Sequence, residues 1–158
     1  MNKSIFYYHY VSPLGVLTLE ASETALLGLH FGDVVPKNAI QKETLLLTDC
    51  MHQLEEYFDK KRTAFTLPLE PRGTVFQQKV WQALTTIPYG ETRSYKQIAE
   101  MIDNPKACRA VGMANNRNPI SLIIPCHRVI GANGSLVGYG GGLAIKEKLL
   151  VLEGFLLG

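Results

Sequence analysis

The sequence predicts an α+β fold, with a small antiparallel sheet near the N-terminus and mainly helices after it. Residues 5–31 form short β-type runs separated by turn residues, whereas residues 44–58 have apolar side chains at helical spacing. Helical spacing then recurs from residue 74 onward. A chain of 158 residues can form one domain or two small lobes. We expect an N-terminal lobe at 1–70 and a C-terminal lobe at 71–158.

The N-terminal elements are expected to form a strand meander covered by one helix. A Ser-Pro-Leu-Gly sequence at 12–15 predicts the first hairpin turn. The expected strands lie at 5–11, 16–21 and 25–31. The helix at 44–58 would cover one face of this sheet. Its inward stripe should consist of Leu47, Met51, Leu54 and Phe58.

Three helices are expected in the first part of the C-terminal lobe. The first starts near Thr74 and is stopped by Pro88 and Gly90. Ser94 followed by Gln97 is a capping-box pattern, which predicts the start of the second helix. The third would begin with Pro105 as its first residue and run to residue 116. Two short helices joined by a tight turn indicate a helix-turn-helix, although any two neighbouring helices of a small bundle would give the same sequence pattern.

The charge distribution favours a phosphate-bearing partner for the C-terminal lobe. Residues 1–70 carry six Lys/Arg against nine Asp/Glu, and residues 71–158 carry ten against five. A basic lobe on a chain of net charge +2 is a modest indication of nucleic-acid binding. The third helix is rich in Ala and Gly, so it could approach DNA closely but read little base sequence.

The cysteines and the apolar segments exclude several protein classes. Three cysteines without CxxC spacing predict neither a disulfide framework nor a zinc ribbon, and they fit a reducing, cytoplasmic setting. No apolar stretch approaches a membrane span, and the N-terminus lacks the pattern of a secretory signal. A metal site gathered from Cys126, His127, His30 and His52 stays a weak alternative, because no pair has zinc-ligand spacing.

The sequence IIPCHRVI at 123–130 places Cys126, His127 and Arg128 inside what we expect to be a buried strand. A thiol is a strong nucleophile only as thiolate, so a base must take its proton. Strand neighbours point to opposite faces. The chain must therefore bend at Pro125, or a water must carry the proton to His127. Glu147 lies on the apolar stripe of the last helix, and we expect it to pair with and orient His127. An inert buried cysteine is the alternative.

The Pro-Cys-His-Arg-Val sequence resembles the signature of the O6-alkylguanine-DNA alkyltransferases. The resemblance runs from about Phe76 to Gly154 and includes TVFQQKVWQAL, IPYGETRSY, NNRNPISLIIPCHRVIG, GSLVGYGGGLAIKEKLL and LEG, in that order. It implies a ribonuclease H-like N-terminal lobe, although residues 1–70 carry no comparably specific motif. It also implies a single-turnover repair protein, without a cofactor, that moves an alkyl group from O6 of guanine in DNA to its own cysteine.

The resemblance also assigns roles to individual residues. It makes Cys126 the alkyl acceptor, His127 its water-mediated base, Glu147 the group that orients His127, and Asn118 a brace for the turn. Arg109 would enter the base stack in place of the flipped nucleotide, and Tyr95 would contact a phosphate and protonate the leaving guanine. The remaining DNA contacts would come from Ala107, Ala110, Gly112, Asn115 and Arg117. The base pocket would be lined by Ser121, Pro125, Tyr139, Gly140 and Gly141.

Two departures from the family pattern are visible in the sequence. Cys50 is the only cysteine before residue 108, so the N-terminal zinc site of some relatives is not expected. Ser121 stands where some relatives have a second proline, which bears on pocket width. We expect a monomer that binds duplex DNA largely without sequence preference. The alternatives are a protein that binds alkylated bases without transfer, disfavoured by Cys126, and a cysteine hydrolase, which would need an oxyanion hole.

Overall fold

The computed structural model describes residues 4–136 and 142–156. The chain divides into two compact units, Met1–Arg72 and Gly73–Gly158. Their mixture of a sheet with helices confirms the predicted α+β class. Within the described residues, no helix is long and apolar enough to cross a membrane.

A four-stranded sheet forms the first unit, in the order β3-β2-β1-β4. The antiparallel strands β1 (Ile5–Ser12), β2 (Gly15–Ala21) and β3 (Leu26–Phe31) form the predicted meander. The β1–β2 turn uses Gly15 at a φ of 96°, a conformation that a side chain would disfavour. The short β4 (Ala39–Gln41) pairs in parallel with β1 and was not predicted, because three residues, one half-buried and two exposed, carry little pattern.

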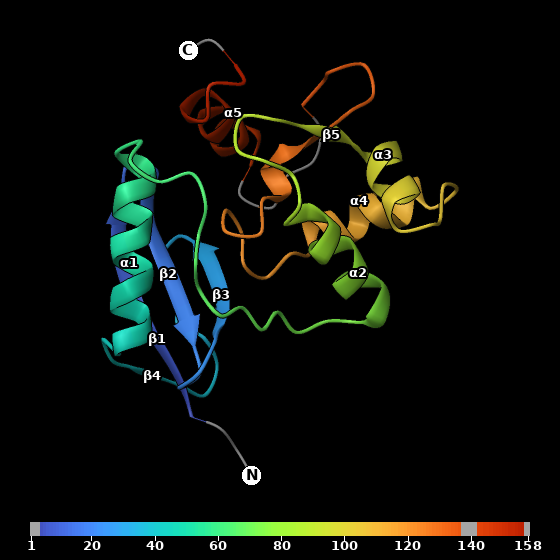
Figure 1. Ribbon diagram of the computed structural model, residues 1–158. Coiled ribbons are helices and arrows are strands. Elements are labelled where there is room, and N and C mark those ends of the chain that lie inside the picture. The colour runs from blue at the N-terminus through green and yellow to red at the C-terminus, as the bar shows by residue number, and fades with distance from the viewer. Residues whose placement is uncertain (1–3, 137–141, 157–158) are drawn as a thin grey trace. The chain divides into compact units, whose positions relative to one another are not determined.

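Helix α1 (Leu45–Phe58) packs against β1 and β2 (Figure 1). Thr44 caps it by accepting a hydrogen bond from the Leu47 backbone N–H. The predicted inward stripe was partly wrong, because the helix is rotated so that Cys50 and Tyr57 are fully buried while Met51 and Phe58 are only half-buried. The buried residues of α1 are Leu47, Cys50, Gln53, Leu54 and Tyr57.

The second unit is mainly helical. Its helices are α2 (Val75–Leu84), α3 (Tyr95–Met101), α4 (Cys108–Asn116) and α5 (Leu143–Leu152). Helices α2, α3 and α4 pack on one another (Figure 1). The indole N–H of Trp81 donates to the carbonyl of Ala114 at 2.8 Å, which fixes α2 against α4. A two-stranded parallel ladder joins β5 (Arg93–Ser94) to β6 (Val129–Ile130).

The helix starts in this unit follow the local sequence where a capping residue is present. Thr74 with Gln77 and Ser94 with Gln97 both form complete capping boxes. The predicted start of the third helix at Pro105 was wrong. Helix α4 begins only at Cys108, because the chain turns at Asp103 with a φ of 58° and continues in turns to residue 107.

The segment around the cysteine is not the buried strand expected from its β-branched residues. Residues 121–124 form turns, with Leu122 at a φ of 72°, and only Val129–Ile130 is a strand. Between them lies η1 (Cys126–Arg128), one turn of 3-10 helix. Pro125 has no N–H to donate to a neighbouring strand. The carbonyl of Ile124 already accepts from the backbone N–H of Cys126 at 2.7 Å, so strand pairing is interrupted here.

Candidate active site

The 3-10 turn η1 carries Cys126, His127 and Arg128 as consecutive, buried residues. Cys126 is 3% exposed and His127 is 0% exposed. With about three residues per turn, neighbouring side chains leave the axis about 120° apart, whereas in a strand they would point to opposite faces. The turn therefore allows Cys126 and His127 to serve one site, which a regular strand would not.

Asn118 holds the chain that leads into this turn. Its Nδ2 donates to the carbonyl of Ile124 at 2.8 Å, and its Oδ1 accepts from the backbone N–H of Ile120 at 3.0 Å. Both bonds are buried. They tie the loop to a point two residues before Cys126, which gives Asn118 the bracing contacts expected of it.

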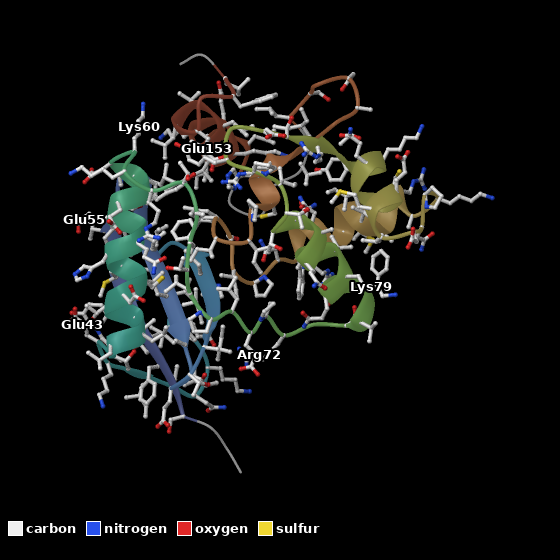
Figure 2. All side chains as sticks on the ribbon, viewed as in Figure 1. Glu43, Glu55, Lys60, Arg72, Lys79 and Glu153 are labelled. Atoms are coloured by element: carbon white, nitrogen blue, oxygen red, sulfur yellow. The ribbon has the colours of Figure 1, made fainter. Side chains whose placement is uncertain are left out.

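Glu153 is the carboxylate that pairs with His127. His127 Nε2 donates to Glu153 Oε2 at 2.8 Å, and Figure 2 labels Glu153 near the end of α5. Arg128 grips the same carboxylate, with Nε on Oε1 at 2.8 Å and Nη2 on Oε2 at 3.0 Å. Its Nη1 donates to the carbonyl of Ile87 at 2.6 Å. Arg128 therefore holds Glu153 in place, which accounts for a residue whose role the sequence left open.

The end of α5 places Glu153 by a backbone motif. Glu153 is the C-cap, and Gly154 follows with a φ of 82°. The N–H of Gly154 bonds to the carbonyl of Val151, and the N–H of Phe155 bonds to that of Leu150. This is a Schellman ending, which favours glycine at the position after the cap. The Leu-Glu-Gly sequence thus both ends the helix and fixes the position of the Glu153 carboxylate.

Electrostatics keep Glu153 ionised and His127 neutral. Although burial favours the protonated acid, the hydrogen bonds and charges of His127 and Arg128 hold the pKa of Glu153 at about 2. Burial lowers the pKa of His127, and Glu153 opposes that effect. A neutral His127 that donates from Nε2 leaves Nδ1 as an acceptor. Nδ1 is buried and has no hydrogen-bond partner among the described residues.

Lys146 of α5 is a further buried charged side chain near the thiol. Its Nζ donates to the carbonyl of Val129 at 2.6 Å. Burial lowers the pKa of Lys146 to about 8, and the charge of Cys126 acts in the opposite direction. The attraction is mutual, so an ammonium at Lys146 stabilises the thiolate of Cys126.

Tyr95 is brought to the site by the β5–β6 ladder. Ser94 pairs with Ile130, so Tyr95 starts α3 beside the strand that follows η1. Burial, followed by the charge of Cys126, raises the pKa of Tyr95. The hydroxyl therefore keeps its proton at neutral pH and can donate it.

Helix α4 has one face toward the site and one toward solvent. Arg109, Ala110 and Arg117 are exposed, while Ala107 and Gly112 are half-buried. A Cβ on Gly112 would lie 3.8 Å from the Tyr95 ring, an ordinary contact, so α4 passes close to that ring. Asn115 points inward, where its Nδ2 donates to the carbonyl of Cys126 at 3.3 Å.

Two family models together match nearly the whole chain. Residues 75–155 match the DNA binding domain of 6-O-methylguanine DNA methyltransferase, and residues 5–71 match its ribonuclease-like domain. The chain belongs to the 6-O-methylguanine DNA methyltransferase family.

Named relatives and solved structures agree with this family. The methylated-DNA--protein-cysteine methyltransferase of Methanosarcina acetivorans is 50% identical, over 95% of this chain and 99% of the relative. That of Mycobacterium leprae is 50% identical, over 90% and 88%. The crystal structure of Mycobacterium tuberculosis OGT in complex with DNA aligns with a TM-score of 0.89 at 48% identity, over 94% of this chain and 92% of that chain.

Two site predictions made within this family were wrong. Glu147 is exposed on α5 and has no ion pair among the described residues, because the inward face of that helix is formed by Lys146, Leu149 and Leu150. Its predicted role falls to Glu153. Asn115 was expected to contact DNA, but it is 1% exposed and bonded to Cys126.

Sequence reasoning missed Glu153 and Lys146. The available signal for Glu153 was its position directly before a glycine that ends a helix. Such a residue is the C-cap, so the position of its side chain at the helix end is fixed by the backbone. Lys146 had no such signal, since lysines are rarely fully buried.

The predicted pocket lies only partly in the described chain. Pro125 is buried and Ser121 is half-buried. Tyr139, Gly140 and Gly141 lie outside the described residues. Among the described residues, no group of three or more His, Cys, Asp or Glu side chains could hold a metal ion.

Proposed function

We propose that this protein repairs DNA by moving the alkyl group of O6-alkylguanine to its own Cys126, once per molecule. The observation that carries the proposal is the buried pair Cys126 and His127 on η1, with Glu153 from the end of α5 bonded to His127, next to helices α3 and α4 in a member of an alkyltransferase family. The C-terminal lobe, residues 71–158, would bind DNA and accept the alkyl group, and residues 1–70 would support it.

Activation of the thiol follows from the hydrogen-bond pattern. His127 Nδ1 is an acceptor, and Nε2 is held by an ionised Glu153. A water between Cys126 and Nδ1 would pass the thiol proton to the imidazole. Because neighbouring side chains leave a 3-10 turn in different directions, the thiol and the imidazole do not need to touch. Glu153 then stabilises the imidazolium. Lys146 adds a positive charge near the thiolate.

The transfer step balances without a cofactor. The thiolate sulfur of Cys126 attacks the alkyl carbon, the bond from that carbon to O6 breaks, and guanine leaves with the electron pair. Tyr95 donates a proton to the departing base, and the tyrosinate regains one from the imidazolium of His127 by way of solvent. Overall, guanine gains the proton that the thiol lost, and the product is a thioether. The thiolate of Cys126 is a poor leaving group from this neutral thioether, so the alkyl group stays on the protein and the reaction ends there.

Access to the damaged base requires that it leave the helical stack. A guanine inside duplex DNA does not expose its alkyl carbon to a buried thiol, so flipping is the route we propose. Helix α4 would lie against the DNA backbone with Arg109 inserted into the stack. Its exposed face offers Arg109, Ala110 and Arg117, which supports binding through phosphates with little base reading. We propose that one monomer is sufficient.

The test is the mass of the Cys126 peptide after incubation with an oligonucleotide that contains O6-methylguanine. One methyl group in place of one hydrogen, in amounts limited to one per protein, is the expected result. Cys126→Ala should show no transfer, whereas Cys108→Ala, which removes a half-buried cysteine of α4, should still be methylated at Cys126. Turnover beyond one equivalent, or methylation elsewhere, would refute the proposal. The same assay with O4-methylthymine decides whether that base is a substrate.

A further inference from the structure

Among the described residues, only two buried side-chain polar atoms have no hydrogen-bond partner, and both lie beside the nucleophile. They are His127 Nδ1 and Asn115 Oδ1. His127 follows Cys126 in the chain, and Asn115 bonds to the carbonyl of Cys126 at 3.3 Å. Buried polar atoms are normally satisfied, because leaving one unpaired costs free energy. Two such atoms, on residues that adjoin or contact Cys126, point to a ligand that they share.

The orientation of the Asn115 amide is set by its bonded end. The carbonyl of Cys126 can only accept, so the atom of Asn115 that faces it must be the donor Nδ2. The other atom is therefore Oδ1, an acceptor with no donor among the described residues. A buried water needs about two to four polar partners, and Oδ1 together with Nδ1 supplies two.

The proton relay imposes the same requirement on its water. To move the thiol proton, the water must accept from the S–H of Cys126 and donate one hydrogen to His127 Nδ1. Its second hydrogen then needs an acceptor inside a buried site. If none were present, the water would turn and its lone pair would no longer face the thiol.

We propose that Asn115 is a positioning residue for this relay, with Oδ1 accepting the second hydrogen of the water between Cys126 and His127. The inference rests on the proposed function. In the step itself, the S–H proton passes to the water as a water proton passes to Nδ1, so no other bond is made or broken. Asn115 Nδ2 meanwhile holds the peptide of Cys126.

The transfer rate as a function of pH tests this role. The assay is single-turnover methyl transfer from O6-methylguanine DNA, at DNA concentrations that saturate each variant. In Asn115→Leu, which has nearly the same shape but no polar atoms, the midpoint of the profile should move to higher pH. The rate near pH 7 should fall roughly ten- to hundredfold, as for the loss of a hydrogen bond to a charged group. The rate should recover above the midpoint, where the thiolate forms unaided.

The order of two variants separates a water acceptor from simple packing. Asn115→Ala leaves room for a second water in place of Oδ1, so the shift should be smaller than in Asn115→Leu. If Asn115 only fills space, the alanine variant should be the worse of the two, because it leaves a cavity. Thermal unfolding checks that each variant is folded. If the leucine variant is unfolded, a midpoint shifted to higher pH in the alanine variant supports the role of Asn115, and an unshifted midpoint overturns it.

The other titratable groups around Cys126 and His127 stay unchanged in these variants. They are Tyr95 of α3, Tyr89 of the loop after α2, Arg128 of η1, Lys146 of α5 and Glu153 after α5. Asn116→Leu, on the exposed side of the same helix, should leave the midpoint in place. An unshifted midpoint in both Asn115 variants, with equal loss of rate at every pH, would overturn the inference but not the proposed function. A wild-type protein that transfers nothing overturns both.

Discussion

Replacing Glu153 by glutamine tests the site most directly. The change removes one charge and keeps the size and shape of the side chain. The matched control is Glu147→Gln, which makes the same change on the exposed side of α5. A difference between the two variants therefore reports the environment of the carboxylate and not the loss of a charge in general.

The structural cost of Glu153→Gln follows from three hydrogen bonds that its carboxylate accepts. Oε1 accepts from Arg128, and Oε2 accepts from both His127 and Arg128. An amide has one N–H₂ end, and either orientation places that end against an N–H of Arg128. Breaking a buried ion pair costs about 3–5 kcal/mol. The fall of the Glu153 pKa from 4.5 to about 2 corresponds to about 3 kcal/mol at about 1.36 kcal/mol per pKa unit, which agrees.

This loss should be visible in thermal unfolding. For a protein of this size, each 1 kcal/mol lowers Tm by roughly 2–4 °C. We therefore expect Glu153→Gln to unfold roughly 6–20 °C below the wild type. Glu147→Gln should unfold within about 2 °C of it, as surface substitutions usually stay within about 0.5 kcal/mol.

The catalytic cost is expected to be larger than the loss of stability suggests. Without the carboxylate, the imidazolium of His127 loses its counter-charge. An amide N–H toward Nε2 also favours the tautomer with its proton on Nδ1, which cannot accept from the relay water. The corresponding change in a Ser-His-Asp triad lowers the rate about 10⁴-fold, and we expect about 10³–10⁴-fold here.

The assay is single-turnover methyl transfer at a temperature where circular dichroism shows each variant to be folded. The reasoning would be refuted if Glu153→Gln kept a rate within about threefold of the wild type. It would equally be refuted if Glu147→Gln lost as much activity as Glu153→Gln.

Further predictions concern DNA binding, the leaving group, acid stability and the helix end. Arg109→Ala should slow repair of duplex DNA far more than reaction with free O6-alkylguanine base; equal losses in the two assays would contradict insertion into the stack. Tyr95→Phe should slow transfer roughly 10²-fold or more at saturating DNA, with little change in Tm, and an unchanged rate would remove Tyr95 from the reaction. Because the folded-state pKa of Glu153 lies below its unfolded value, the unfolded state binds more protons between about pH 4.5 and 2. The free energy of unfolding of the wild type, measured with urea, should therefore fall as pH falls through that window, whereas that of Glu153→Gln should not show this fall. The same pH dependence in both proteins would contradict the pairing of Glu153 with His127 and Arg128. Gly154→Ala should lower the free energy of unfolding by about 1–2 kcal/mol, because Gly154 has a φ of 82°, which a side chain disfavours. Glu147→Ala on α5 serves as the neutral control. An unchanged Tm in Gly154→Ala would contradict this account of the helix end.

Local sequence signals predicted the parts of the fold that depend on a few consecutive residues. The hairpin at residues 12–15 and the capping box at Ser94 both form as expected. Each involves backbone groups within about four positions, so the residues that determine them are adjacent in the sequence. The start of α4 was misplaced because Asp103 adopts a left-handed conformation that the Pro105 pattern does not reveal.

The nucleophile that we propose was also identifiable from the sequence, but its surroundings were not. Pro-Cys-His-Arg-Val marks Cys126 and His127 without reference to any distant residue. The choice between Glu147 and Glu153 depended on how far α5 rotates and where it ends. The helix is apolar on most sides, so its periodicity could not specify the inward face, and the fold buries Lys146 while exposing Glu147.

The sequence by itself determined the α+β class, the helix caps and the motif that holds the thiol, because these are written in neighbouring residues. Only the tertiary structure decided that Glu153 and Arg128 complete the site, and that Asn115 faces Cys126 instead of solvent. Those contacts join residues 11 to 26 positions apart, and their strength comes from burial, where an unpaired charge or amide is costly. Burial is a property of the packed chain, which no single segment contains.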